Sequence, residues 1–132
     1  MPVKSIIKMK TKRIYSTCTG SITLDDFDRY HNEVWGNSGL IGFQEIFDLT
    51  KADLSLLSYS DLLLLIDQTT LIKNFTPESR IALINTGGQE EKVSFYCSAK
   101  QFLKQPSRTI LSFQNNSKAL NWLESCGCSQ PM

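Results

Sequence analysis

Five side chains that can form hydrogen bonds gather around the end of one predicted strand. Asp48 and Thr50 stand at the carboxyl end of a strand predicted over residues 43–49, and Ser58, Tyr59 and Ser60 open the helix that follows. In open α/β sheets, ligands bind outside the carboxyl ends of the strands. A carboxylate, hydroxyls and a phenol can hold a ligand or a partner there. We therefore take these residues as the candidate ligand- or partner-binding site.

A candidate anion-binding site lies where the last predicted helix begins. Asn115, Asn116 and Ser117 offer uncharged hydrogen-bond donors, and Lys118 follows them. Helix N-termini attract anions through their free N–H groups and the helix dipole. The same residue types are preferred N-caps, so simple capping is the competing interpretation. The turn at residues 86–88 is less suited to an anion, because two glutamates follow it.

The sequence lacks the parts of an acyl-transfer enzyme. Such catalysis needs a nucleophile, a base and a group that orients the base. His31 is the one histidine of the chain, and its place within a predicted helix favours a surface or half-buried role. Asp25, Asp26 and Asp28 cluster at the start of that helix, where negative charge offsets the helix dipole. No Gly-x-Ser-x-Gly motif occurs, so we predict no catalytic residue and no enzyme activity.

Metal and cofactor binding are not predicted. Cys18, Cys97, Cys126 and Cys128 fit no zinc-ligand spacing, and the chain has only one histidine to add to them. We expect no metal and no cofactor. The N-terminus lacks the long apolar segment of a signal peptide, so we expect a cytoplasmic protein with reduced thiols.

The charge distribution predicts no nucleic-acid partner. The net charge is only +1, although Lys4, Lys8, Lys10, Lys12 and Arg13 crowd the start of the chain. A basic arm of this kind could touch nucleic acid or an anionic membrane. Lysines also deter aggregation at the exposed edge of a sheet, and we favour that interpretation.

An apolar run without interruption begins at Leu62 and ends at Ile66. A helix with such a run is buried on more than one side or meets a partner. The run is far shorter than the roughly 20 apolar residues that span a bilayer, so we expect no stable membrane insertion. Two interpretations stay open: core packing, and a surface for a protein partner or a homodimer.

Apolar periodicity predicts the elements that position these groups. Period-two patterns predict strands over residues 3–9, 13–19 and 43–49, with a hairpin between the first two. Strands are also predicted over residues 80–85, buried on both faces, and 108–113. Helices are predicted over residues 23–35 and 89–103. A third helix is predicted to begin after Ser58 or Ser60, and the last one is predicted to end at Gly127. The order β-β-α-β-α-β-α-β-α predicts one α/β domain over residues 1–132, with a mixed, largely parallel five-stranded sheet flanked by four helices.

Three local signals set the expected boundaries of these elements. Thr23 and Asp26 form a variant of the capping box at the start of the first helix. Gly20 is expected to end the second strand, and residues 50–57 are expected to form a loop.

The order of elements and several segments resemble a known family. Residues 45–50 read Glu-Ile-Phe-Asp-Leu-Thr, and residues 57–62 read Leu-Ser-Tyr-Ser-Asp-Leu. Together with residues 80–83 and 119–123, these segments resemble the STAS domain of anti-sigma-factor antagonists. The whole chain is most similar to the SpoIIAA-like group of small bacterial STAS/Sec14-type domains.

This resemblance implies a regulatory role. STAS regulators bind a partner kinase and are phosphorylated on a serine at the start of the helix after the Asp-bearing strand, a position that Ser60 matches. The family pattern there is Asp-Ser-Ser-Gly, whereas this chain reads Ser58, Tyr59, Ser60 and Asp61, without the acid and the glycine. The Sec14-like packing of the group implies an apolar ligand. We therefore expect a non-enzymatic interaction or regulatory module, with a carrier of a small apolar ligand or lipid as the alternative.

Overall fold

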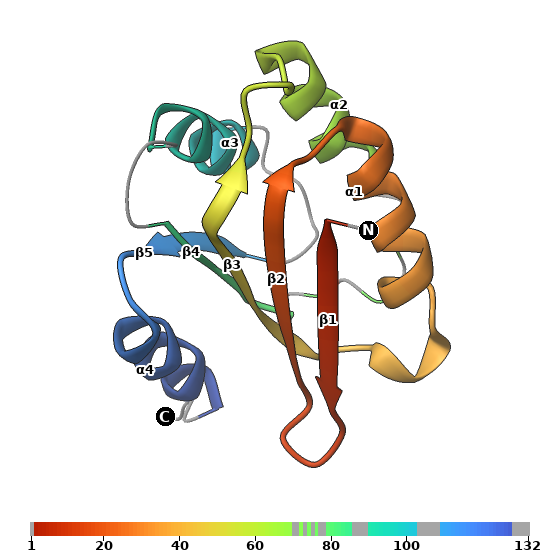
Figure 1. Ribbon diagram of the computed structural model, residues 1–132. Helices are drawn as coiled ribbons and strands as arrows, with labels where there is room; N and C mark the ends of the chain where they lie inside the picture. Colours follow the sequence, from red (N-terminus) through yellow and green to blue (C-terminus); the bar gives the residue numbers. More distant parts are fainter. Residues whose placement is uncertain are drawn as a thin grey trace.

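A mixed sheet forms the centre of the molecule (Figure 1). The computed structural model describes residues 2–69, 72, 74, 76, 79–85, 90–102 and 109–127. Within these residues, five strands lie in the order β1-β2-β3-β4-β5; β1 and β2 are antiparallel, and the later pairs are parallel. The elements are β1 (Val3–Lys8), β2 (Arg13–Ser21), α1 (Leu24–Tyr30), β3 (Gln44–Asp53), α2 (Tyr59–Thr69), β4 (Ile81–Ile84), α3 (Glu90–Phe102), β5 (Ile110–Phe113) and α4 (Asn116–Gly127).

The helices divide between the two faces of the sheet. The crossovers β2-α1-β3, β3-α2-β4 and β4-α3-β5 all step in one direction, and right-handed crossovers then place their helices on the same face. α4 follows the last strand and lies on the opposite face (Figure 1). There, Ala119 and Leu123 pack in a second, smaller core with Ile46, Ala82 and Ile84. The larger core therefore lies between the sheet and α1, α2 and α3.

The central strands confirm the α/β architecture expected from the sequence. All four residues of β4 are buried, as expected for a strand covered on both faces. β2 instead alternates, with Ile14, Ser16 and Cys18 buried on the side of the larger core. The predicted hairpin between β1 and β2 is also present.

Two predicted boundaries are wrong at the carboxyl end of β2 and β3. β2 continues past Gly20 to Ser21, and Gly20 takes a positive φ of 78° that suits glycine. β3 runs to Asp53, although residues 50–57 were expected to form a loop. The register shifts by one extra residue on β3 between Asp48 and Lys51, which is a β-bulge. The bulge lets the two strands stay paired for three further residues on each strand.

The first helix begins as predicted and changes its form before it ends. Thr23 and Asp26 make the capping box with both of its hydrogen bonds. After α1 the chain continues as a π-helix from His31 to Trp35, where an ordinary α-helix was expected. Gly36 follows, and a Cβ at this position would clash with the carbonyl oxygen of Asn32.

Candidate functional site

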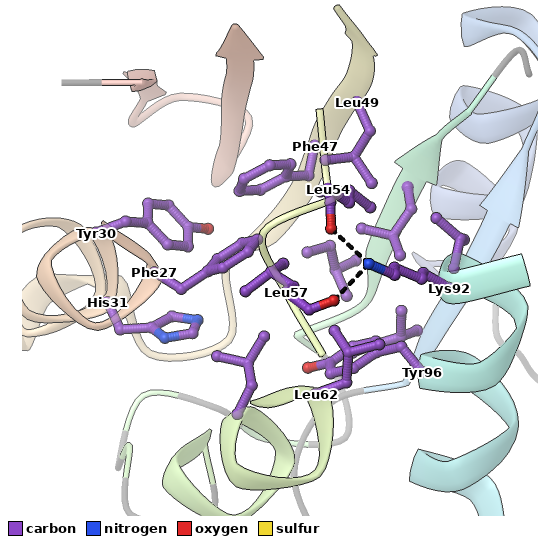
Figure 2. A pocket seen from close by; sticks show the side chains of 15 residues that line it. Phe27, Tyr30, His31, Phe47, Leu49, Leu54, Leu57, Leu62, Lys92 and Tyr96 are labelled. Carbon is purple, nitrogen blue, oxygen red and sulfur yellow. Dashed lines mark hydrogen bonds between the residues drawn. The ribbon is translucent and has the colours of Figure 1, made fainter. Parts of the chain in front are cut away.

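A small apolar cavity, partly open to solvent, lies between the sheet and the three helices α1, α2 and α3 (Figure 2). Its volume is about 60 Å³. At roughly 10–15 Å³ for each water-sized group, that leaves room for about four to six such groups. The described lining residues are mostly aliphatic or aromatic: Phe27, Tyr30, His31, Phe47, Leu49, Leu54, Leu57, Leu62, Leu65, Ile81, Leu83, Lys92, Val93, Tyr96 and Ile110.

Each wall of the cavity comes from a different part of the chain. Phe47 and Leu49 of β3 belong to the sheet floor, together with residues of β4 and β5. Leu54 and Leu57 are buried in the connection from β3 to α2. α2 and α3 contribute buried side chains, such as Leu65. The cavity therefore depends on the packing of elements that are distant in sequence.

Lys92 is the one lysine or arginine among the described lining residues. Its Nζ donates a hydrogen bond to the carbonyl oxygen of Leu54, at 2.8 Å, and another to that of Leu57. Figure 2 shows these two bonds, which join α3 to the connection between β3 and α2. The ammonium group thus lies at the wall of a largely apolar space.

His31 lies in the opposite wall, within the π-helical segment. Its ring centroid is 4.9 Å from that of Tyr30 and 6.5 Å from that of Phe27. The expectation of a surface or half-buried histidine is wrong, because only 7% of His31 is exposed. Tyr30 and His31 are consecutive and both buried, and the π-helix widens the turn that carries them.

A buried polar cluster lies beside the cavity, under α1 and the π-helical segment. Glu45 of β3 is fully buried and accepts hydrogen bonds from Ser16 Oγ at 2.7 Å and Trp35 Nε1 at 3.3 Å. It also accepts a hydrogen bond from the hydroxyl of Tyr30. Ser16 is in turn 2.7 Å from the hydroxyl of Ser5. Because Tyr30 also lines the cavity, this cluster fixes one wall of it.

The architecture matches a solved structure. It is an uncharacterized protein of the DUF3478 family from Shewanella loihica PV-4, with a SpoIIAA-like fold. The TM-score is 0.58 over 92% of this chain and 93% of the other, at 22% sequence identity. This chain has the SpoIIAA-like fold. No protein-family model and no curated protein matches it.

In this SpoIIAA-like fold, the predicted site residues do not form one group around the cavity. Asp48 pairs with Ile84 in the row of residues that faces α4, on the other side of the sheet from the cavity. Its Oδ1 accepts a hydrogen bond from the backbone N–H of Thr50, at 2.9 Å, and so stabilises the bulge. Tyr59 is 45% exposed and packs edge-on against Phe95 of α3, with ring centroids 4.8 Å apart.

Ser58 and Ser60 have different roles at the start of α2. Ser58 Oγ accepts a hydrogen bond from the backbone N–H of Asp61, and the Asp61 carboxylate accepts one from the backbone N–H of Ser58, both at 3.0 Å. This reciprocal pair is a capping box. Ser60 is exposed on the first turn.

We expect Ser58→Ala to lower the free energy of unfolding by about 1 kcal/mol, because the cap is lost. Ser60→Ala is the matched control; it removes an exposed hydroxyl and should change stability by less than about 0.5 kcal/mol. Urea denaturation followed by circular dichroism measures both values. Equal losses in the two variants would show that Ser58 is not the cap.

The candidate anion site at the start of α4 shows a capping arrangement. Asn115 Oδ1 accepts a hydrogen bond from the backbone N–H of Lys118, at 2.9 Å. Asn116 and Ser117 are exposed. Anion binding at these residues stays a prediction, and the turn at residues 86–88 lies outside the described part of the chain.

The apolar run in α2 serves both the core and the surface. Leu62, Leu65 and Ile66 are buried, whereas Leu63 is 44% and Leu64 is 51% exposed. In the described part of the chain, every helix is too short or too polar to cross a bilayer.

The cysteines and acids described here show no metal-binding arrangement. Among the described residues, no three His, Cys, Asp or Glu side chains are placed to hold a metal ion. Burial raises the thiol pKa of Cys18 and of Cys97 to about 11, and the negative charge of Asp26 adds to the rise for Cys18. Thiols with such a pKa are weak nucleophiles at neutral pH. The side chains of Cys126 and Cys128 lie outside the described residues.

Proposed function

We propose that this protein is a non-enzymatic binding module that takes a small apolar ligand in the cavity under α1, α2 and α3. The observation that carries the proposal is the cavity itself, with its apolar lining and a few polar groups at the wall. Ligand sites in proteins are typically apolar pockets with a small number of placed polar groups. Ligand binding here fits the expectation of an apolar ligand and needs no catalytic group.

The size of the cavity limits the ligand. At about 60 Å³, it is smaller than the engineered cavity of about 150 Å³ that binds benzene. A ligand of a few non-hydrogen atoms fits, and a longer chain has to extend through the opening or move the helices apart. A complete phospholipid is therefore a poor candidate for this arrangement of the helices.

A cavity-filling substitution tests the proposal. Leu65→Phe puts a ring into the cavity, whereas Leu63→Phe puts the same ring on the exposed face of α2. Native mass spectrometry of freshly purified protein, before and after organic extraction, measures the bound ligand. We expect a small molecule to accompany the wild type and Leu63→Phe and to be absent from Leu65→Phe. Clean apo masses in all three, or equal occupancy in the two variants, would contradict the proposal.

A second candidate function is favoured by exposed apolar side chains near the same helix. Leu56, Tyr59, Leu63 and Leu64 are each at least 44% exposed. Where such side chains form a patch, they mark a site of protein interaction. A protein partner or a second copy of the chain could cover these residues, as expected for a regulatory module. Sedimentation equilibrium over a range of concentrations would reveal a homodimer, and a constant monomer mass would count against one.

A further inference from the structure

We propose that the cavity is specific for a small apolar carboxylate, and that the ammonium group of Lys92 binds the ligand's carboxylate. This inference rests on the proposed function, because it names the class of ligand for the same cavity. The starting observation is the number of N–H hydrogen-bond donors on the Lys92 side chain. An ammonium group has three N–H donors, and Lys92 uses two of them on the carbonyl oxygens of Leu54 and Leu57. The described residues provide no hydrogen-bond partner for the third donor.

The charge around Lys92 favours an anion over a neutral ligand. Both of its hydrogen-bond acceptors are backbone carbonyls, which carry no net charge. Among the described residues that line the cavity, none is an aspartate or a glutamate. Lys92 is half-buried, and a charge that is partly withdrawn from water gains stability when it is paired. A ligand carboxylate would pair with the ammonium and accept its third hydrogen bond.

Asp53 is an acidic residue that interacts with the charge of Lys92. Its pKa is lowered mainly because the backbone and side chain of Ser55 donate hydrogen bonds to it, and the positive charge of Lys92 is the smallest of the causes. Asp53 is exposed, and its Oδ1 accepts the Ser55 N–H at 2.9 Å. Water screens an exposed carboxylate of this kind, so it neutralises little of the charge of the Lys92 ammonium.

The single ammonium also discriminates between anions. One positive charge neutralises one carboxylate, whereas a phosphate would bring close to two negative charges into a largely apolar space. The apolar lining, including Leu62 and Val93, accommodates a short hydrocarbon chain next to the carboxylate. Butanoate is a suitable probe: it contains six non-hydrogen atoms, as many as benzene, so part of its chain has to extend toward the opening of the cavity.

The test compares butanoate with butanamide, a neutral molecule of the same shape. Titrations at pH 7, followed through the NMR signals of the Leu62, Leu65 and Val93 methyl groups, give both dissociation constants. We expect butanoate to bind at least about tenfold more tightly, since hydrogen bonds to charged groups are the stronger kind. Lys92→Met should bring the two constants within about twofold, and Lys92→Arg should restore the preference. Lys4→Met, which removes an exposed lysine on β1, is the control and should leave the preference unchanged.

The outcomes separate this inference from the proposed function. Equal binding of the two ligands to the wild type, or an undiminished preference in Lys92→Met, overturns the carboxylate assignment and leaves the cavity as a ligand site. Methyl signals that respond to neither ligand overturn both proposals. If Lys92→Met does not fold, Lys92→Gln replaces it, because glutamine keeps an N–H donor without the charge. It should show the same loss of preference.

Discussion

Glu45→Ala should lower the free energy of unfolding by about 3–5 kcal/mol, one of the two largest effects that we expect of a single substitution. The fully buried carboxylate accepts hydrogen bonds from Ser16, Tyr30 and Trp35. Without this carboxylate, the buried donors lose their hydrogen-bond acceptor, and a cavity is left beside β3. Urea denaturation of the variant, extrapolated to water, measures the loss.

Two further variants define the cause of this loss. Glu45→Gln keeps the shape and one acceptor oxygen, so we expect it to lose less stability than Glu45→Ala. Asp48→Ala removes a carboxylate from the same strand, but this one is only half-buried, and its acceptor bond is local to the bulge. It should lose no more than about 1 kcal/mol. Equal losses for Glu45→Ala and Asp48→Ala would show that the cluster around Glu45 does not stabilise the fold.

Trp35→Ala should lower the free energy of unfolding by about 3–5 kcal/mol, the range for a large aromatic side chain removed from a core. Trp35 is only 1% exposed, and it donates a hydrogen bond from Nε1 to the Tyr30 hydroxyl at 2.9 Å. It ends the π-helical segment that carries His31 into the cavity wall. Thermal and urea denaturation measure the loss, and the methyl NMR signals of Leu62 and Leu65 report whether the cavity keeps its shape.

Trp122→Ala is the matched control for Trp35→Ala. Trp122 is half-buried on α4, 5.5 Å from the ring of Phe113, with the Arg80 guanidinium 4.9 Å from its own ring. Much of this side chain stays in contact with water, so we expect a loss of no more than about 2 kcal/mol. A loss as large as that of Trp35→Ala would show that α4 contributes as much to stability as the larger core does.

The architecture could be predicted from the sequence because local patterns determine it. The apolar run of β4 indicates a strand covered on both faces, and the alternation in β2 indicates one core-facing side. The Thr23 capping box fixes the start of α1 from only four residues. These signals lie within single elements and do not depend on distant partners.

The boundaries that were predicted wrongly depend on tertiary pairing. β3 continues past Leu49 because β2 is long enough to pair with it and a bulge corrects the register. The sequence of the segment after Leu49 gives no local signal that the strand continues. The rule that ligands bind at strand ends therefore led to Asp48 and Thr50, although β3 does not end there.

The cavity and its polar wall could not be predicted for the same reason. Glu45 was visible as a charged residue on the core-facing side of a strand, which is a signal of a buried polar cluster. Its partners, however, are 10 to 29 residues away and come from different elements. In the sequence, Lys92 is an ordinary residue of a predicted helix. Only the structure shows that α3 places it against the carbonyl groups of Leu54 and Leu57.

A crystal structure of the protein under xenon pressure tests the central claim most directly. Small apolar cavities in proteins bind xenon, and the cavity of about 60 Å³ is the candidate ligand site. We predict xenon density, or density of a molecule retained from purification, among Phe47, Leu62 and Val93. Xenon bound only elsewhere, with the cavity filled by rearranged side chains, would contradict the account.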